Sequence, residues 1–277
     1  MVYASQDQVF AQPLLEEFTE ETGIKVRAVF DSEAVKTVGL VNRLIAEASN
    51  PRCDVFWNNE EFRTRQLEQR GLLRSERPWV AFGERRRVLA VNTNLVAPSR
   101  WPRGMIELTN HSWRGKVAFS YPVFGTTSSH FLALHQRWGE RNWEVWCRTF
   151  VGNEPKMVDG NSVAARLVAR GEAEVALTDS DDLEMIRRSG APVVGVPLEG
   201  EGFVIPNTVA VLRGAPHPEE AEILCQFLTR KEALQKLQTS GALQEKIAAA
   251  QEESVDWEEL LSSHERVIHQ LKELFLR

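Results

Sequence analysis

The chain has 277 residues, of which 43% are hydrophobic and 26% are charged, and its formal net charge is −6. This length allows two lobes or one large domain with a substantial core. The acidic balance offers no basic surface to nucleic acid, which argues against nucleic acid as a partner. No apolar run reaches the ~20 residues that a membrane span needs.

The cysteines and the N-terminus bear on the compartment. Cys53, Cys147 and Cys225 stand far apart without ligand-type spacing. This excludes a zinc cluster and a dense disulfide framework, and the odd number favours free buried thiols over one long-range bridge. The opening MVYASQDQVF has neither the basic nor the apolar region of a signal peptide. A processed, mature N-terminus would begin in the same way, so the compartment stays open at this end.

Apolar strand-type segments alternate with amphipathic helical segments along the chain. Strands are predicted over 24–30, 53–57, 86–96, 115–122, 155–159, 173–178, 191–198 and 203–214. Helices are predicted over 13–23, 35–48, 60–71, 126–139, 162–171, up to about 190, and through the last ~60 residues. This alternation predicts an α/β fold with largely parallel sheets. We expect lobe one to comprise 1–92 and 204–277, and lobe two to comprise 93–203.

Small or polar residues follow nearly every predicted strand. In open α/β sheets such positions lie at the carboxyl ends of the strands, where ligands bind. Two lobes joined by strands that cross twice would bring these turns face to face across a cleft. The candidate ligand-binding residues are Ser5, Gln6, Asn58, Asn59, Thr126, Thr127, Ser128, Asn161, Asp181 and Asp182. Trp57, between two of them, is a further candidate to line the cleft.

The stretch VALTDSDDLEMI, residues 175–186, places three aspartates after a strand. One of them is expected to cap the following helix, because an aspartate oxygen accepts orphan backbone N–H bonds there. Three carboxylates exceed what capping requires, and like charges so close raise one another's pKa unless a cation lies among them. Asp181 and Asp182 are therefore candidate ligands of a hard metal ion or an ammonium group.

The stretch FGTTSSH, residues 124–130, joins a predicted strand to a predicted helix. Small and hydroxyl residues there leave backbone N–H groups available to an anion. Capping by Thr126 or Thr127 is the simpler structural explanation, and the same alternative applies to Asn161 and Ser162. His130 is expected on a helix face rather than as a ligand.

Six segments, taken in chain order, carry a resemblance to a known family. They are VYASQDQVFAQPLLEEFTEETGIKV, CDVFWNNEE, VLAVNTNLV, GKVAFSYPVFGTTSSH, DGNSVAARLVARGEAEVALTDSDD and VIPNTVAVLRGAPHPEEA. With them the chain resembles, over essentially its whole length, family-1 extracellular solute-binding proteins, and more narrowly the iron(III)-type substrate-binding proteins of ABC transporters. The resemblance implies a two-lobed type II periplasmic-binding-protein fold with a ligand cleft between the lobes. It also implies a periplasmic or cell-surface monomer that closes on a small solute and delivers it to an ABC permease in the membrane.

The ferric-binding members of that family hold iron with two adjacent tyrosines just after the strand that matches AEVALT. Here those positions hold Asp181 and Asp182, and the only tyrosines, Tyr3 and Tyr121, are not adjacent. Ligation of ferric iron by a tyrosinate pair at those positions is therefore excluded.

Two further family ligands are also replaced. The family's histidine after the first strand falls near Gln6 or Asp7, and its glutamate falls near Asn59. The family's synergistic anion, or a ligand phosphate, lies at the loop that matches residues 124–130. The resemblance thus implies a bound metal ion with such an anion, and no other cofactor.

Several functions stay open at this point. The first is the substrate-binding component of an iron(III)-type ABC importer, which is not an enzyme. The second is a carrier of an organic anion or zwitterion, such as a phosphonate or sugar phosphate, with its anion at the helix N-termini and any amine on the aspartates. The third is a metal-dependent hydrolase that uses the aspartates, although the chain has no nucleophile elbow, HExxH, P-loop or GxGxxG motif. A ligand-sensing receptor would share the fold, but no DNA-binding or transmembrane segment accompanies it.

Overall fold

The computed structural model describes residues 1–30, 36–76, 79–244 and 255–276. The chain forms two compact units. The first comprises Met1–Arg85 and Ile205–Lys246, and the second comprises Arg86–Val204 and Ile247–Arg277. The chain passes from the first unit to the second within β4 (Val80–Asn92) and returns at the start of β9 (Val204–Val211). Among the described residues, no helix is both long enough and apolar enough to cross a membrane.

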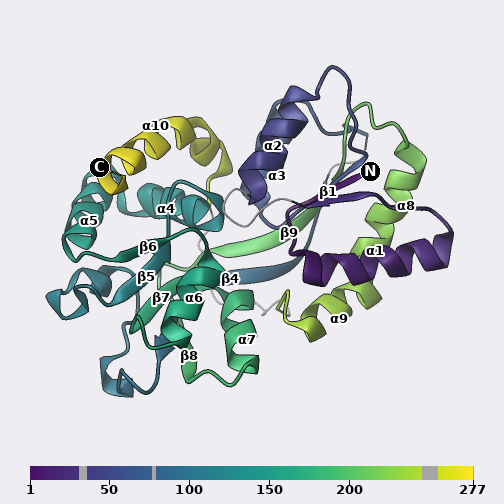
Figure 1. The fold of residues 1–277 in the computed structure, drawn as a ribbon. Coiled ribbons are helices and arrows are strands. Elements are labelled where there is room, and N and C mark those ends of the chain that lie inside the picture. Colours follow the sequence, from purple (N-terminus) through teal and green to yellow (C-terminus); the bar gives the residue numbers. More distant parts are fainter. Residues whose placement is uncertain (31–35, 77–78, 245–254, 277) are drawn as a thin grey trace. The chain divides into compact units, whose positions relative to one another are not determined.

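The first unit contains a four-stranded sheet in the order β2–β1–β3–β9 (Figure 1). The central β1 (Val2–Ala4) pairs in parallel with β2 (Ala28–Phe30) and with β3 (Val55–Asn58). β9 is antiparallel to β3. The helices of this unit are α1 (Gln8–Thr22), α2 (Lys36–Ala46), α3 (Glu61–Gln69), α8 (Pro218–Thr229) and α9 (Lys231–Ser240).

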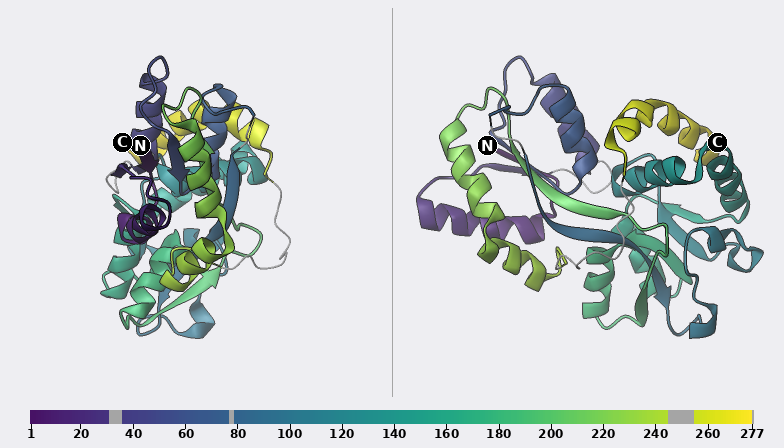
Figure 2. Two further views of the ribbon diagram at one scale, coloured as in Figure 1. Left: turned by 90° about the vertical axis from the view of Figure 1, so that its right-hand side faces the viewer. Right: turned by 180° about the vertical axis from the view of Figure 1, so that it is seen from behind.

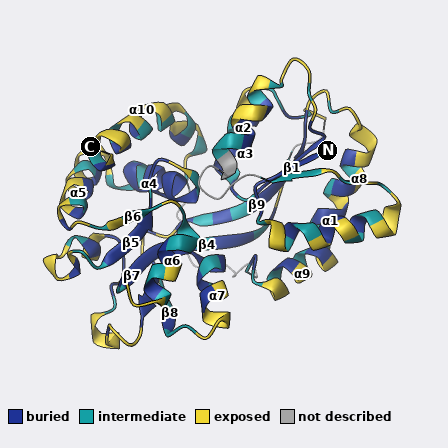
Figure 3. Ribbon diagram, viewed as in Figure 1, coloured by how far each residue is buried: buried dark blue, intermediate teal, exposed yellow. Residues whose placement is uncertain are grey.

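Helices cover both faces of this sheet. Successive strand residues point to opposite faces, so neighbouring apolar residues pack against different helices. Val2 and Trp57 pack with apolar residues of α1, α8 and α9. Tyr3 and Phe56, which adjoin Val2 and Trp57 in their strands, pack instead with apolar residues of α2 and α3. Figure 3 shows the resulting pattern of buried strands beneath helices whose outer faces are exposed.

The second unit contains a five-stranded sheet in the order β8–β4–β7–β5–β6. Its strands beside β4 are β5 (Val117–Ser120), β6 (Lys156–Val158), β7 (Val175–Asp179) and β8 (Val193–Pro197). β5, β6 and β7 are mutually parallel, whereas β4 runs antiparallel to β7 and to β8. The helices are α4 (Gly125–Trp138), α5 (Glu140–Gly152), α6 (Asn161–Ala169), α7 (Ser180–Arg188) and α10 (Trp257–Phe275). Three short 3₁₀ helices, Pro98–Arg100, Ile106–Thr109 and His111–Trp113, follow β4.

The two faces of the second sheet carry different side chains. Ala118 and Ala176 of the sheet meet Ala164 and Ala165 of α6, and these small residues let the helix lie close to the strands. On the opposite face, the ring centroid of Phe119 lies within 6.1 Å of the rings of Phe131, Phe150 and Phe275. Aromatic residues of α4, α5 and α10 thus form one cluster against the sheet.

The α/β prediction is confirmed, and three details of it are corrected. The division that placed 204–277 with lobe one is wrong for α10, which lies along α4 and α5 in the second unit (Figures 1 and 2). The strand predicted over 86–96 begins earlier, at Val80, and ends at Asn92. Helix α5 was not predicted as an element.

The structure also bears on the predictions for Trp57 and for the three cysteines. Trp57 does not line a ligand site: its side chain is fully buried and lies 6.2 Å from the ring of Phe82 in the core of the first unit. The preference for free thiols is confirmed, since Cys53, Cys147 and Cys225 are all unpaired. Burial raises the pKa of Cys53 and Cys225 to about 12.

Candidate functional site

Polar side chains converge at one edge of the second sheet. Because β5, β6 and β7 are parallel, their carboxyl ends lie at the same edge, and α4, α6 and α7 begin there. This edge carries Thr126 and Thr127 in the first turn of α4, Asn161 at the start of α6, and the aspartates around the start of α7. The structure therefore brings together the part of the predicted site that lies in the second unit.

Arg87 is the cation of this cluster. Its strand is antiparallel to β7, and the register places it directly opposite Asp179. Arg87 Nη1 donates to Asp179 Oδ1, and the two side chains are 0% and 4% exposed. Arg87 Nη2 also donates to Thr127 Oγ1 at 3.2 Å. The guanidinium is thus held by a carboxylate and a hydroxyl group in the interior of the unit.

The second carboxylate oxygen of Asp179 is also occupied. Thr126 Oγ1 donates to Asp179 Oδ2 at 2.8 Å, and Asn161 Nδ2 approaches the same oxygen at 3.3 Å. Asn161 Oδ1 in turn accepts from Ser120 Oγ and from Thr127 Oγ1, both at 3.0 Å. Arg87, Ser120, Thr126, Thr127, Asn161 and Asp179 form one hydrogen-bonded group, called the Arg87–Asp179 cluster below. Of the other predicted residues in this unit, Ser128 is buried on α4.

The capping explanation is wrong for Thr126, Thr127, Asn161 and Ser162. The N-cap residues are Phe124 for α4 and Gly160 for α6, and neither makes a side-chain cap hydrogen bond. The expectation that one aspartate caps α7 is confirmed in position, because Asp179 is its N-cap residue, but the side chain of Asp179 makes no cap hydrogen bond. The side chains of Thr126, Thr127 and Asn161 bond side chains of other elements and not the backbone N–H groups at the helix ends.

Asp179, Asp181 and Asp182 lie close enough for a common ion. Each can offer a carboxylate oxygen within 4.8 Å of the others, and no other group of three potential metal ligands occurs in the described part of the chain. Asp181 is 6% exposed, and Asp182 Oδ2 accepts from Thr178 Oγ1 at 3.2 Å. Carboxylate oxygens are the ligands that hard cations prefer.

Predicted site residues of the first unit form a second polar group, at the carboxyl ends of β1 and β3. Ser5 Oγ donates to Asn58 Oδ1 at 2.8 Å and to Asn59 Oδ1 at 3.1 Å. The backbone N–H of Asn59 donates back to Ser5 Oγ at 2.8 Å. Gln6 Oε1 accepts from Asn207 Nδ2 at 2.8 Å. The structure thus gathers Ser5, Gln6, Asn58 and Asn59 within their own unit.

Several members of both polar groups were not predicted from the sequence. In the first unit these are Thr64 and Thr208: Asn58 Nδ2 donates to Thr64 Oγ1 at 3.0 Å, and the hydroxyl groups of Thr64 and Thr208 are hydrogen-bonded at 2.6 Å. In the second unit they are Arg87 and Ser120. The signal for Arg87 was an arginine directly before the buried run VLAV, a position that requires a buried partner.

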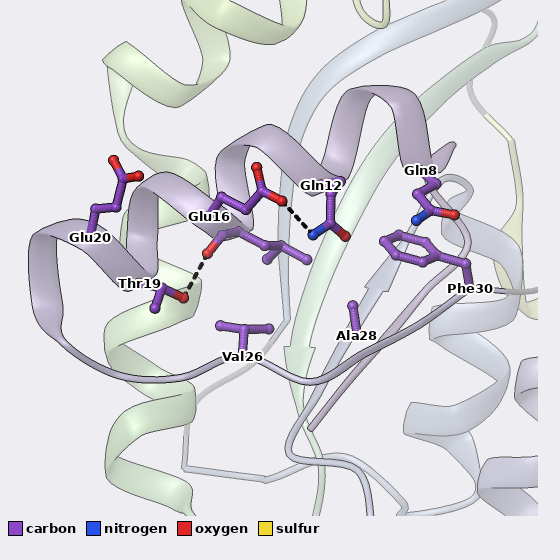
Figure 4. Close-up of a pocket in the computed structure, with 9 residues that line it drawn as sticks. Gln8, Gln12, Glu16, Thr19, Glu20, Val26, Ala28 and Phe30 are labelled. Carbon is purple, nitrogen blue, oxygen red and sulfur yellow. Dashed lines mark hydrogen bonds between the residues drawn. The ribbon is translucent and has the colours of Figure 1, made fainter.

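The structure also contains a cavity away from these residues (Figure 4). It has a volume of about 470 Å³ and lies between α1 and residues 26–30, which include β2. Its lining includes Gln12, which donates to Glu16 at 2.8 Å, and Phe30. None of the predicted ligand-binding residues lines it.

Residues 1–242 match the family of bacterial extracellular solute-binding proteins. The chain belongs to this family. Iron uptake protein A1 of Synechocystis sp. is 26% identical over 261 residues, which cover 84% of this chain and 71% of that protein. The predicted role in solute binding is thereby confirmed, and neither the family nor this relative favours the hydrolase alternative.

Solved structures match this solute-binding protein over nearly its full length. Iron-bound HitA from Pseudomonas aeruginosa aligns with a TM-score of 0.83 at 19% identity, covering 98% of both chains. The periplasmic binding protein AfuA from Actinobacillus pleuropneumoniae, with fructose-6-phosphate bound, aligns with a TM-score of 0.85 at 18% identity, covering 99% of this chain and 98% of that one. These likenesses confirm the two-lobed type II fold.

Proposed function

We propose that this solute-binding protein is the substrate-binding component of an ABC importer and that its cargo is ferric iron, held by the carboxylates of Asp181 and Asp182. The observation that carries the proposal is the group of three aspartates whose carboxylate oxygens reach within 4.8 Å of one another. The relative named for iron uptake and the iron-bound structural neighbour support the same cargo.

The chemistry of the aspartates fits a ferric ion. Ferric iron is a hard cation, and carboxylate oxygens are hard, negatively charged ligands. Asp179 is paired with Arg87, and Asp181 and Asp182 add two further carboxylates to the same group. They occupy the positions where the resemblance places the tyrosine pair, so carboxylates would replace phenolates in the same location along the chain.

Transport follows from the family. The protein would capture its cargo outside the cytoplasm, in the periplasm or at the cell surface, and deliver it to a membrane permease without a catalytic step. Contacts from Ser5, Gln6, Asn58 and Asn59 and closure of the two lobes on the solute stay predictions.

A second candidate cargo is an organic phosphate. The hydroxyl and amide groups of Thr126, Thr127 and Asn161 are typical phosphate donors, and the AfuA structure contains a sugar phosphate. This alternative requires those groups to turn from their present partners toward the solute.

A thermal-shift panel on metal-stripped protein separates the two cargoes. A ligand at ~100 times its dissociation constant adds ~2.7 kcal/mol of stability, which raises Tm measurably. We expect ferric citrate to stabilise the protein and the Asp181→Asn/Asp182→Asn variant to lose this effect. Glu184→Gln, which removes a carboxylate of the same helix outside the aspartate group, should retain it. Stabilisation by fructose-6-phosphate or a phosphonate, with none by iron, would replace the iron proposal by the organic phosphate.

A further inference from the structure

We infer that the carboxylate of Asp179 is a built-in anion that occupies the donors of the Arg87–Asp179 cluster and excludes free anions from them. The inference deepens the proposed function and rests on it for the identity of the cargo, because it makes the cargo a cation that needs no second anion at this place. Asp179 would then be a residue that determines specificity against phosphate-bearing solutes.

The donors that a small oxyanion would use here already bond the carboxylate of Asp179. A small oxyanion at the start of α4 and α6 would need the hydroxyl of Thr126, the amide of Asn161 and a cation. In the structure these three donors all meet the carboxylate of Asp179, through Thr126 Oγ1 at 2.8 Å, Asn161 Nδ2 at 3.3 Å and Arg87 Nη1. A carboxylate has two oxygens with about four acceptor positions, and these donors fill most of them.

The charges of Arg87 and Asp179 also disfavour a free anion. Arg87 is the one cation of the cluster, and its side chain is 0% exposed. Asp179 neutralises it at contact distance, so a free anion entering here would meet a buried carboxylate beside a cation that is already neutralised. Like charges in a buried site repel strongly, and an unpaired buried charge is costly. The cluster in its present form therefore repels phosphate.

The backbone places Asp179 beside the first turns of α4 and α6. Asp179 lies at the end of β7, in register with Arg87. Thr126 lies in the first turn of α4, and Asn161 begins α6, at the same edge of the sheet. A side chain that reaches this point from a strand end occupies the space that a bound oxyanion would otherwise take.

Rescue by small carboxylates tests the inference directly on metal-free protein. Asp179→Ala creates a space lined by Arg87, Thr126 and Asn161, and formate or acetate should enter it. We expect these ions to raise the Tm of Asp179→Ala saturably, by roughly 5 °C or more, beyond the effect of the same concentration of chloride. Asp179→Asn is the matched control: it removes the charge but fills the space, so formate should not stabilise it. Equal effects of formate on the wild type and on Asp179→Ala would overturn the inference.

A measurement on the wild type covers the case in which Asp179→Ala does not fold. Metal-free wild-type protein should show no saturable Tm rise with phosphate, because its donors are occupied. A saturable rise that Thr126→Val abolishes would show that the donors accept a free anion, and the inference would then be wrong. Neither experiment contains iron, so both can fail while iron binding stands, and iron binding can fail while formate rescue stands.

Discussion

Arg87 and Asp179 lie directly opposite each other on the antiparallel strands β4 and β7 and form an ion pair whose side chains are 0% and 4% exposed. They are 92 positions apart in sequence. Because both charges are removed from water, each depends on the other and on the surrounding hydroxyl and amide groups for stabilisation.

Removing one member of this pair should destabilise the second unit strongly. Arg87→Met leaves Asp179 charged and buried without its cation, at an expected cost of ~3–5 kcal/mol in the free energy of unfolding. The double variant Arg87→Met/Asp179→Leu removes both charges and should lose much less. Urea denaturation of metal-free protein measures both. Equal losses in the single and double variants would show that the ion pair contributes little.

The order of strands and helices could be predicted because it follows from the local periodicity of apolar residues along the chain. Leu14, Leu15 and Phe18 have the spacing of one helix face within the helix predicted over 13–23, and all three are buried. The start of β4 escaped prediction because GERRR, residues 83–87, does not look like a strand, although residues 80–92 form one. Periodicity also identified the last helix but not the surface that its apolar face covers, which placed it with the wrong lobe.

The location of the candidate site could be predicted, but not its hydrogen bonds. Asp181 and Asp182 follow a strand of a largely parallel sheet, and that alone places them at its carboxyl edge. Whether Thr126 caps its helix or bonds a distant carboxylate depends on strand register, which local sequence does not specify. Arg87 was missed for the same reason, since its partner becomes adjacent only when β4 and β7 pair.

His130 should make the protein less stable in acid. It is fully buried on α4, with Nε2 2.8 Å from the carbonyl oxygen of Glu201. Burial, and to a lesser degree the charge of Arg87, lowers the pKa of His130 to about 3. In the unfolded chain this group takes up a proton below about pH 6.5, so between pH 6.5 and 3 the unfolded state binds more protons and stability falls as the pH falls.

The slope of stability against pH measures this effect. His130 alone should contribute up to ~1.4 kcal/mol per pH unit in that window. His130→Gln can still donate to the carbonyl of Glu201 but does not titrate, so its stability should fall less steeply. His111→Gln, at an exposed position, controls for the loss of a histidine. Identical slopes in wild type and His130→Gln would contradict the expectation.

The C-terminal helix should contribute to the stability of the second unit through Phe275. This side chain is 3% exposed and its ring lies 5.7 Å from that of Phe119 and 5.8 Å from that of Phe131. Phe275→Ala should cost ~3–5 kcal/mol, because it removes a large buried ring and leaves a cavity. The neighbouring Leu276 is 48% exposed, so Leu276→Ala should change stability by no more than about 0.5 kcal/mol. Chemical denaturation compares the two, and similar losses would mean that α10 does not stabilise this unit.

Gly83 should be far less tolerant of a side chain than Gly23. Both have positive φ, +57° and +73°, which strains any L-residue. A Cβ at Gly83 would lie 2.4 Å from Leu243 Cδ1 and 2.9 Å from Leu234 Cδ1, whereas at Gly23 nothing lies within 4 Å. Gly23→Ala should therefore cost ~1–2 kcal/mol from strain alone, and Gly83→Ala a further ~1–3 kcal/mol from overpacking. Equal costs by urea denaturation would show that the two leucines repack freely.

Thr178 should tune the proposed ferric site through Asp182. Its hydroxyl donates to Asp182 Oδ2 at 3.2 Å and to the carbonyl oxygen of Asn161 at 3.1 Å. Thr178→Val keeps the shape of the side chain but removes the donor that orients the carboxylate. Loss of such an outer contact typically weakens metal affinity about 10-fold or more. Thr149→Val is the control and should leave affinity unchanged, because the hydroxyl of Thr149 donates to the carbonyl of Val145 in its own helix.

Competition titrations with a ferric chelator measure this affinity, and denaturation of the metal-free variants separates binding from stability. Thr178→Val should lose ~1–3 kcal/mol of stability because the carbonyl of Asn161 loses a buried donor. The expected result is a weaker ferric complex in a protein that still folds. An unchanged ferric affinity in Thr178→Val, with binding still dependent on Asp181, would mean that Asp182 is not a ligand and that Asp181 binds the ion with other partners.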